Sequence, residues 1–204
     1  DAASLSMGAE AVADAIRENG ADVAVTRTGT RGLLWLEPLV EIEIAGRRVG
    51  FGPVAAADVP DILAQGEAHP LCLGSVEDIP YLKSQQRLTF ARCGVIDPVS
   101  LDDYTAHGGL KGLTRAVAMA PQAIVEDVTE SGLRGRGGAG FPTGIKWNTV
   151  LQAKSSRKYI VCNADEGDSG TFADRILMEG DPFLLIEGMA IAGLAVGATR
   201  GYIY

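Results

Sequence analysis

SGLRGRGGAGFPTGIKW, residues 131–147, contains six glycines, three basic residues and no acidic residue, in a chain whose formal net charge is −8. Glycine has no Cβ and adopts positive φ at little cost, so a glycine-rich run lets main-chain N–H groups come close to a ligand. The basic residues Arg134, Arg136 and Lys146 lie among those N–H groups. The segment therefore predicts a loop that binds an anion.

Two familiar nucleotide-binding motifs do not explain this loop. The spacing Gly135-x-Gly137-x-x-Gly140 matches the dinucleotide fingerprint, but that motif follows a strand and has an acidic residue about 20 positions later. Here a helix is expected over 121–130, and the later position is Ser155. The Gly-Lys-Ser/Thr ending of a P-loop is also absent from the sequence. An ordinary glycine-rich surface loop is the alternative to an anion site.

The composition is typical of a globular protein of the reducing cytoplasm. Acidic residues exceed basic ones by 26 to 18, which argues against a nucleic-acid partner because such proteins present a basic face. The three cysteines are widely spaced and odd in number, so neither disulfides nor a metal site is expected. The apolar stretch 182–198 is interrupted by Glu187 and is shorter than the roughly 20 residues that span a bilayer, so no membrane insertion is expected.

The hydrophobic pattern predicts an α/β chain with two domains. A small domain over 1–66 combines helices, a strand and a β-hairpin, which are expected over 7–19, 21–27, 39–52 and 55–66. Thioredoxin-like folds have this content. Three prolines interrupt 67–98, which we interpret as a linker.

The second domain is expected over 99–204, around the glycine loop. Its predicted helices and strands lie at 101–119, 121–130, 143–154, 158–163, 174–179 and 201–204. The strand at 158–163 leads into the sequence ADEGDSG, and ligands of open α/β sheets bind at the carboxyl ends of the strands. We therefore expect ADEGDSG to belong to the same site as the glycine loop.

The charges around these two segments are segregated. Residues 131–147 carry only positive charge, whereas 163–187 carries seven acidic residues and one arginine. Main-chain N–H groups at the start of a helix bind phosphate, and carboxylates accept hydrogen bonds from ribose or ribityl hydroxyls. Flavin mononucleotide (FMN) has both kinds of group and fits this distribution.

Together with CNADEGDSGTFADRILMEGDP, residues 162–182, the glycine loop resembles the NADH-oxidising flavoprotein subunit of respiratory complex I. Its soluble relatives are the diaphorase subunits of NAD-reducing hydrogenases and NAD-dependent formate dehydrogenases. The resemblance extends from about residue 100 to the end and is closest to the formate dehydrogenase β subunit. It implies hydride exchange between FMN and NAD(H), and transfer of single electrons to iron–sulfur subunits that serve a formate- or hydrogen-oxidising catalytic subunit.

The resemblance also assigns residues. It implies that the glycine loop holds the FMN phosphate, that the aromatic after the loop stacks on adenine, and that the Asn-Ala-Asp-Glu turn contacts the flavin and the nicotinamide ribose, with Glu166 as the catalytic residue. The implied cofactor-binding residues are Gly135, Gly137, Gly138, Ala139, Phe141, Lys146, Asn163, Asp165, Glu166 and Asp168.

Two departures from the family pattern bear on this site. Thr149 replaces a second aromatic two residues after the tryptophan, which implies weaker adenine stacking, and Asp168 stands where the family often has glutamate. The cysteines of the family's 4Fe-4S cluster lie further along the polypeptide than this sequence extends.

The first domain resembles the thioredoxin-like 2Fe-2S subunit that partners this flavoprotein. The positions that correspond to its ligands are Ser4, Thr30 and Leu34, and iron–sulfur clusters need thiolates. We therefore expect a domain that has lost its cluster and serves in docking. Trp35 lies among leucines; a core position is favoured, with a binding hot spot as the alternative. A docking scaffold without activity is the second hypothesis for the whole chain.

Overall fold

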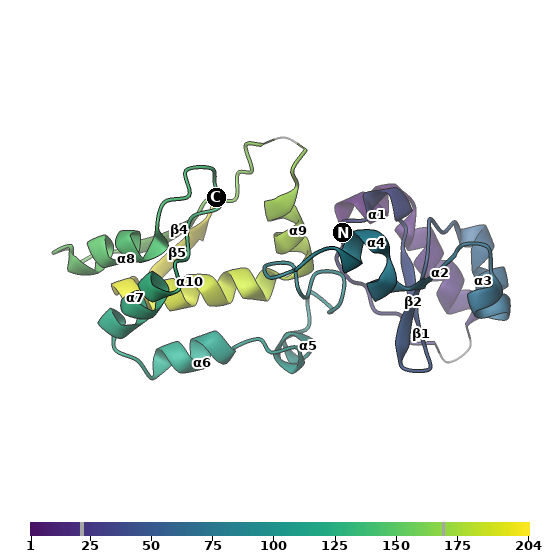
Figure 1. Ribbon diagram of the computed structural model, residues 1–204, viewed down its shortest axis with the longest axis horizontal. Coiled ribbons are helices and arrows are strands. Elements are labelled where there is room, and N and C mark those ends of the chain that lie inside the picture. The colour runs from purple at the N-terminus through teal and green to yellow at the C-terminus, as the bar shows by residue number, and fades with distance from the viewer. Residues whose placement is uncertain (21–22, 169) are drawn as a thin grey trace. The chain divides into compact units, whose positions relative to one another are not determined.

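The computed structural model describes residues 1–20, 23–168 and 170–204, which form two units (Figure 1). Unit 1 contains Asp1–Val99 and Glu179–Asp181, and unit 2 contains Ser100–Met178 and Pro182–Tyr204. Each unit combines helices and strands, so the predicted α/β class is confirmed. The likeness of unit 1 to thioredoxin-like proteins rests on the sequence.

The sheet of unit 1 is built on the predicted hairpin. Strands β1 (Val40–Ile44) and β2 (Arg47–Phe51) pair antiparallel, with Val40 opposite Phe51. Ala45 and Gly46 connect them, both at positive φ (51° and 74°). A two-residue hairpin turn needs positive φ at both positions if its twist is to match that of the strands. Strand β3 (Cys72–Ser75) adds to β2, giving the order β1-β2-β3.

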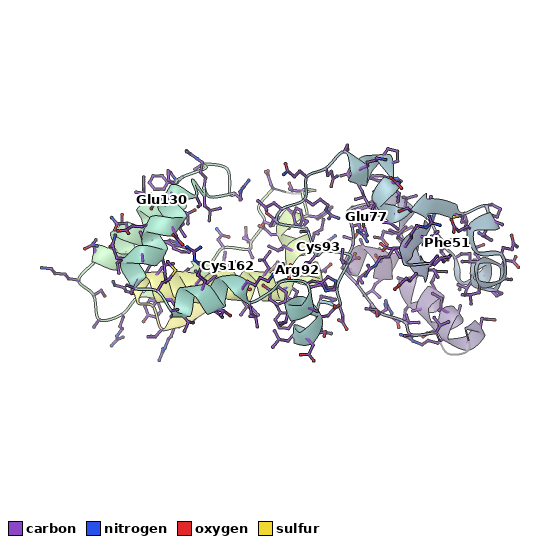
Figure 2. All side chains as sticks on the ribbon, turned by 60° about the horizontal axis from the view of Figure 1, so that its bottom comes forward. Phe51, Glu77, Arg92, Cys93, Glu130 and Cys162 are labelled. Atoms are coloured by element: carbon purple, nitrogen blue, oxygen red, sulfur yellow. The ribbon has the colours of Figure 1, made fainter. Side chains whose placement is uncertain are left out.

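Helices cover this sheet and enclose its core. They are α1 (Ala2–Ser6), α2 (Ala9–Asn19), α3 (Val59–Gln65) and α4 (Pro80–Lys83), with short 3-10 turns η1 (Leu34–Leu36), η2 (Ala56–Asp58), η3 (Gly66–Ala68) and η4 (Val76–Asp78). The helix expected over 7–19 is α2, and that over 55–66 is η2 with α3. The core cluster consists of Val12, Val49, Phe51, Val54, Val59 and Ile62; Phe51 is labelled in Figure 2. Of the strand expected over 21–27, residues 21–22 lie outside the described residues, and 23–27 contains no strand.

The segment 67–98 is part of unit 1, which corrects its interpretation as a linker. It contributes β3 and α4, and Val76, Cys93 and Ile96 are fully buried within it. The prolines stop long helices, but they are compatible with a four-residue strand, and Pro80 occupies the first position of α4. Burial raises the pKa of the Cys93 thiol to about 11, with the Asp181 carboxylate as a further cause, so this thiol stays protonated and unreactive.

Unit 2 is assembled around one central helix. Its elements are α5 (Leu101–Ala106), α6 (Lys111–Val117), α7 (Pro121–Glu130), α8 (Thr143–Gln152), β4 (Tyr159–Cys162), α9 (Ala173–Gly180), α10 (Pro182–Val196) and β5 (Arg200–Ile203). Strands β4 and β5 pair parallel, and α10 contacts α6, α7, α8 and both strands (Figure 1). The core between them contains Ala116, Ile124, Val125, Ala195 and Val196. No helix in the described ranges has the length and apolar character to cross a bilayer.

A buried carboxylate ties α10 to the start of α6. The helix expected over 101–119 is divided into α5, which ends at Ala106, and α6, which begins at Lys111 after Leu110 in the left-handed region. Between them, a Cβ at Gly109 would collide with the Tyr104 ring. Glu187 accepts hydrogen bonds from the Tyr104 hydroxyl and from the N–H groups of Leu110 (2.8 Å) and Leu113 (2.9 Å). Burial alone would raise the pKa of Glu187, but these hydrogen bonds outweigh it and the pKa is lowered.

Candidate functional site

The glycine-rich segment forms a closed loop between α7 and α8. The Gly135 N–H donates to the Phe141 carbonyl at 2.9 Å, and the Thr143 N–H donates to the Leu133 carbonyl at 2.9 Å. The Arg134 side chain spans the loop, donating from Nε to the carbonyl oxygen of Gly140 at 2.5 Å. The base of the loop is therefore fixed by the protein itself, and the Arg134 Nε takes part in closing it.

The tip of this loop, residues 136–140, is open to a ligand. Within the described part of the chain, none of its main-chain N–H groups donates a hydrogen bond to a protein atom. A Cβ added at Gly137 or Gly138 would meet no atom within 4 Å, and Gly138 (φ 104°) and Gly140 (φ 58°) have backbone conformations that favour glycine. Unpaired N–H groups that line free space are the donor set that a phosphate needs, so these residues fit an anionic group.

The first turn of α8 continues this surface. Gly144 lets α8 approach α7, because a Cβ there would collide with Thr129. The first N–H groups of a helix have no partner within it, and the helix dipole favours an anion at that end. Lys146 is exposed, and its Nζ lies 5.9 Å from the centroid of the Phe141 ring, which is 46% exposed. The structure thus brings together two of the predicted site residues beside the loop.

The second predicted segment begins at the carboxyl end of β4. The Ala164 N–H donates to the Tyr204 carbonyl at 2.7 Å, which extends the pairing with β5 beyond the strand. The Asn163 Oδ1 accepts the Asp165 N–H at 3.2 Å, closing a local turn. Asn163, Asp165 and Asp168 are exposed. Their side chains are therefore available to a ligand, as expected for residues that follow a parallel strand.

Glu166 has a defined structural position. Its φ is 51°, in the left-handed region, and its carboxylate accepts the N–H groups of Asp174 (3.2 Å) and Arg175 (3.0 Å). It therefore caps the first turn of α9, where a negative charge is stabilised by unpaired N–H groups. A carboxylate with this restraint has a fixed orientation.

The two predicted segments do not contact each other directly through hydrogen bonds or ion pairs in the described residues, and some of the acidic residues have structural roles. Among the described residues, no hydrogen bond or ion pair joins 131–147 to 163–168. Of the seven acidic residues that indicated a charged half-site, Glu187 anchors α6 and Asp181 accepts the Arg92 Nε at 2.8 Å within unit 1; Figure 2 labels Arg92. The charge segregation is thus partly a packing feature.

The sequence pattern missed two residues at the start of α9. Phe172 lies at φ 54°, and the Arg175 guanidinium carbon is 4.3 Å from the centroid of its ring. The one available indication was that Arg175 is the single basic residue of 163–187. The residue that Arg175 contacts was not predictable from the sequence, because both the neighbouring acidic residues and Phe172 were candidates.

The positions aligned with cluster ligands in unit 1 have other roles. The Ser4 hydroxyl donates to Asp1 at 2.7 Å, the buried Thr30 hydroxyl donates to Glu37 at 2.7 Å, and Leu34 is exposed. Trp35 is 59% exposed and makes an edge contact with Tyr81, with ring centroids 5.1 Å apart. The favoured core position of Trp35 is therefore wrong, since the η1 turn directs its ring to the surface.

Comparison with known proteins finds a family match for the part of the chain that carries the glycine loop. Residues 128–204 match the family described as the Nuo51 FMN-binding domain. The match covers the loop, α8, β4 and the α9 region, which are the elements that hold all the predicted site residues.

The curated relatives have names that agree with this match. The chain is 56% identical over 60% of its length to NADP-reducing hydrogenase subunit HndC of Solidesulfovibrio fructosivorans, covering 25% of that protein. It is 48% identical over 52% of its length to an NADH-quinone oxidoreductase subunit of Escherichia coli (24% covered). NAD-reducing hydrogenase HoxS subunit alpha of Cupriavidus necator is 36% identical over 85% of the chain (28% covered).

The chain thus spans about a quarter of the length of these relatives. A solved NAD+-reducing NiFe-hydrogenase chain is 26% identical over 98% of this chain and 35% of its own length, with a TM-score of 0.46. The family match and the relatives confirm the resemblance to the NADH-oxidising flavoprotein of complex I and its soluble relatives. The description of the family names FMN, and the names of the relatives refer to NADP, NADH or NAD.

Proposed function

We propose that this chain is the FMN-binding, NAD(H)-reactive module of a multi-subunit oxidoreductase. The observation that carries the proposal is the loop tip at 136–140, whose N–H groups are unpaired and whose glycines line open space, within the segment that matches an FMN-binding domain. A phosphate at this tip would accept the free N–H groups and face the positive end of α8.

The residues around the loop have different roles in cofactor binding. Gly135, Gly137, Gly138 and Ala139 provide main-chain approach to the FMN phosphate, and Lys146 adds a positive charge. Phe141 offers an exposed ring for stacking on adenine. When bound, FMN supplies hydride exchange with NAD(H) and single-electron transfer, while the protein orients it and shapes its surroundings.

The turn after β4 supplies the polar half of the site. The exposed side chains of Asn163, Asp165 and Asp168 present oxygen atoms that accept hydrogen bonds from ribityl and ribose hydroxyls. Glu166, held by the first turn of α9, is the residue that we assign to catalysis, because a restrained carboxylate orients a substrate without having to be ordered during the reaction.

The electron donor of the complex is the finer part of the proposal. The sequence resemblance favours NAD-dependent formate dehydrogenase in the cytoplasm, with iron–sulfur subunits and a 4Fe-4S cluster of the flavoprotein as electron carriers. The 85% coverage of this chain by a hydrogenase subunit, which includes most of unit 1, favours a hydrogenase diaphorase as the second candidate. Purified native complex should reduce NAD⁺ with formate for the first candidate and with hydrogen for the second.

The module itself is tested by cofactor binding. Flavin-free chain titrated with FMN should quench the flavin fluorescence at one equivalent, and NADH added without oxygen should then bleach the flavin absorbance. A chain that leaves FMN fluorescence unchanged would instead support the docking scaffold without activity.

We expect NADH to be preferred over NADPH. The exposed carboxylates of Asp165 and Asp168 would repel a 2′-phosphate placed near this turn. Asp165→Asn should therefore lower the ratio of kcat/KM values for NADH and NADPH by about tenfold, a loss typical of removing one close charge–charge interaction. Glu166 is left unchanged in this test because its carboxylate caps α9.

The names of the relatives do not decide between NADH and NADPH, since one is named as NADP-reducing and others as NADH- or NAD-dependent. Equal turnover with both dinucleotides in the unmodified protein would place the acidic turn away from the adenosine ribose. Asp61→Asn, which changes a surface carboxylate of unit 1, is the matched control.

Unit 1 is expected to dock an iron–sulfur subunit without carrying a cluster of its own. Trp35 and Tyr81 form an exposed aromatic pair, and such residues dominate binding energy at protein interfaces. Trp35→Ala should weaken co-purification of the partner by at least about tenfold, whereas Leu88→Ala, at an exposed apolar residue of the same unit, should not. Undiminished partner recovery with Trp35→Ala would exclude this surface, and a 2Fe-2S EPR signal from the chain would contradict the loss of the cluster.

A further inference from the structure

Two residues that precede α9 in the sequence have unfavourable backbone conformations. Glu166 (φ 51°) and Phe172 (φ 54°) both lie in the left-handed region. A bulky side chain rarely adopts this conformation, and where it does, surrounding contacts hold it there. The contacts that hold each of these residues are therefore informative about what the turn is built to do.

For Phe172 the contact is the side chain of Arg175. The guanidinium carbon lies 4.3 Å from the ring centroid, well within the range of a cation–π interaction. This arrangement requires the ring to turn back over the first turn of α9, and the left-handed conformation of Phe172 is what places it there. The pair therefore fixes the path by which the chain enters the helix.

Arg175 is committed to this ring although acidic residues surround it in the sequence. Across the described residues, it forms no ion pair with Asp165, Glu166, Asp168 or Asp174, and its buried Nε has no hydrogen-bond partner. A buried guanidinium N–H without an acceptor carries a free-energy cost, and the contact with the Phe172 ring offsets part of it. The charge of Arg175 is used for packing rather than for neutralising the acidic turn.

The same turn holds Glu166. The main-chain N–H groups of Asp174 and Arg175 donate to its two carboxylate oxygens at 3.2 and 3.0 Å. Arg175 thus contributes its N–H to Glu166 and its side chain to Phe172. Any change in the way Phe172 enters α9 moves both donors of the Glu166 carboxylate.

We propose that Phe172 and Arg175 are positioning residues, whose stacked pair sets the first turn of α9 and thereby the orientation of the Glu166 carboxylate. The role of that carboxylate toward the flavin and nicotinamide rests on the function proposed above; the positioning itself is a property of this chain alone. The matched variants are Arg175→Gln and Phe172→Leu, which remove one partner each, and Phe172→Tyr, which keeps the ring. Arg157→Gln, at an exposed arginine of unit 2, is the control.

The first measurement is hydrogen exchange of the Asp174 and Arg175 amides in flavin-free protein. Arg175→Gln and Phe172→Leu should accelerate both by about tenfold or more, since local opening governs exchange, whereas Phe172→Tyr and Arg157→Gln should not. Unchanged exchange in Arg175→Gln overturns the proposal whether or not the protein binds a flavin, and acceleration over the whole of unit 2 overturns it as well, because that would indicate general destabilisation.

The second measurement is NADH oxidation with a soluble electron acceptor by protein loaded with FMN. Positioning predicts a lower kcat in Arg175→Gln, with FMN affinity retained and Phe172→Tyr active. A wild-type kcat in Arg175→Gln overturns the link to Glu166. Absence of flavin binding by the unmodified chain counts against the proposed function and leaves the exchange result as the test of the positioning pair.

Discussion

Gly137→Val is expected to abolish FMN binding while leaving the fold of unit 2 intact. Gly137 lies outside the left-handed region, and a Cβ there meets no protein atom within 4 Å, so a side chain at this position begins in open space. The same branched side chain would fill the space in front of the loop N–H groups.

Lys146→Ala should weaken FMN binding by about tenfold, because a charge-assisted hydrogen bond contributes about 1.5 kcal/mol or more.

Flavin fluorescence titration measures both effects, and circular dichroism with thermal unfolding reports on the fold. Gly188→Val is the matched control, since Gly188 is exposed on α10 and its added Cβ also meets open space. Undiminished FMN affinity in Gly137→Val would remove the loop tip from the site. Loss of the folded structure in that variant would contradict the open space assigned to Gly137.

Glu187→Ala is expected to destabilise unit 2 by about 3 kcal/mol. The substitution leaves the Tyr104 hydroxyl and the N–H groups of Leu110 and Leu113 without their acceptor, and each buried unpaired donor costs about 1–3 kcal/mol, partly relieved by relaxation and water. Urea unfolding at neutral pH measures the loss. Glu130→Ala, at an exposed carboxylate of α7 (Figure 2), should change stability by less than about 0.5 kcal/mol.

The same carboxylate predicts a dependence of stability on pH. Because the pKa of Glu187 is lowered in the folded protein, the unfolded chain binds this proton more readily. The stabilisation is complete above the ordinary glutamate pKa of about 4.3 and is lost as the pH falls through the lower folded value. Glu187→Gln should flatten this part of the profile, and an unchanged acid limb in that variant would assign it to other carboxylates.

Elements with strong local patterns were predictable from the sequence. The alternating apolar and polar residues on either side of Ala45-Gly46-Arg47 predicted the hairpin, because successive side chains of a strand point to opposite faces. Helix α8 and strand β4 followed from the glycine loop and the apolar run after it. These features depend on neighbours in the chain, and their physical causes are contained in a few consecutive residues.

Features that depend on distant partners were not predictable. The segment 67–98 joined unit 1 because β3 pairs with β2, and the prolines that suggested a linker carry no information about that pairing. The helix expected over 101–119 divides where Gly109 meets Tyr104 and where Glu187, far along the chain, caps the second half. The exposure of Trp35 was not predictable for a similar reason, since the burial of a side chain depends on which elements of the fold pack against it.

For the candidate site, the sequence alone determined which residues we propose for binding: the glycines that permit close approach, the lysine of the same segment, and the polar turn that follows strand β4. These are properties of residue type and local order. The tertiary structure decided how those residues are held, with Arg134 closing the loop and the first turn of α9 restraining Glu166. Orientation comes from partners that are remote in the sequence or lie on the next turn of a helix, and those partners become defined only when the chain has folded.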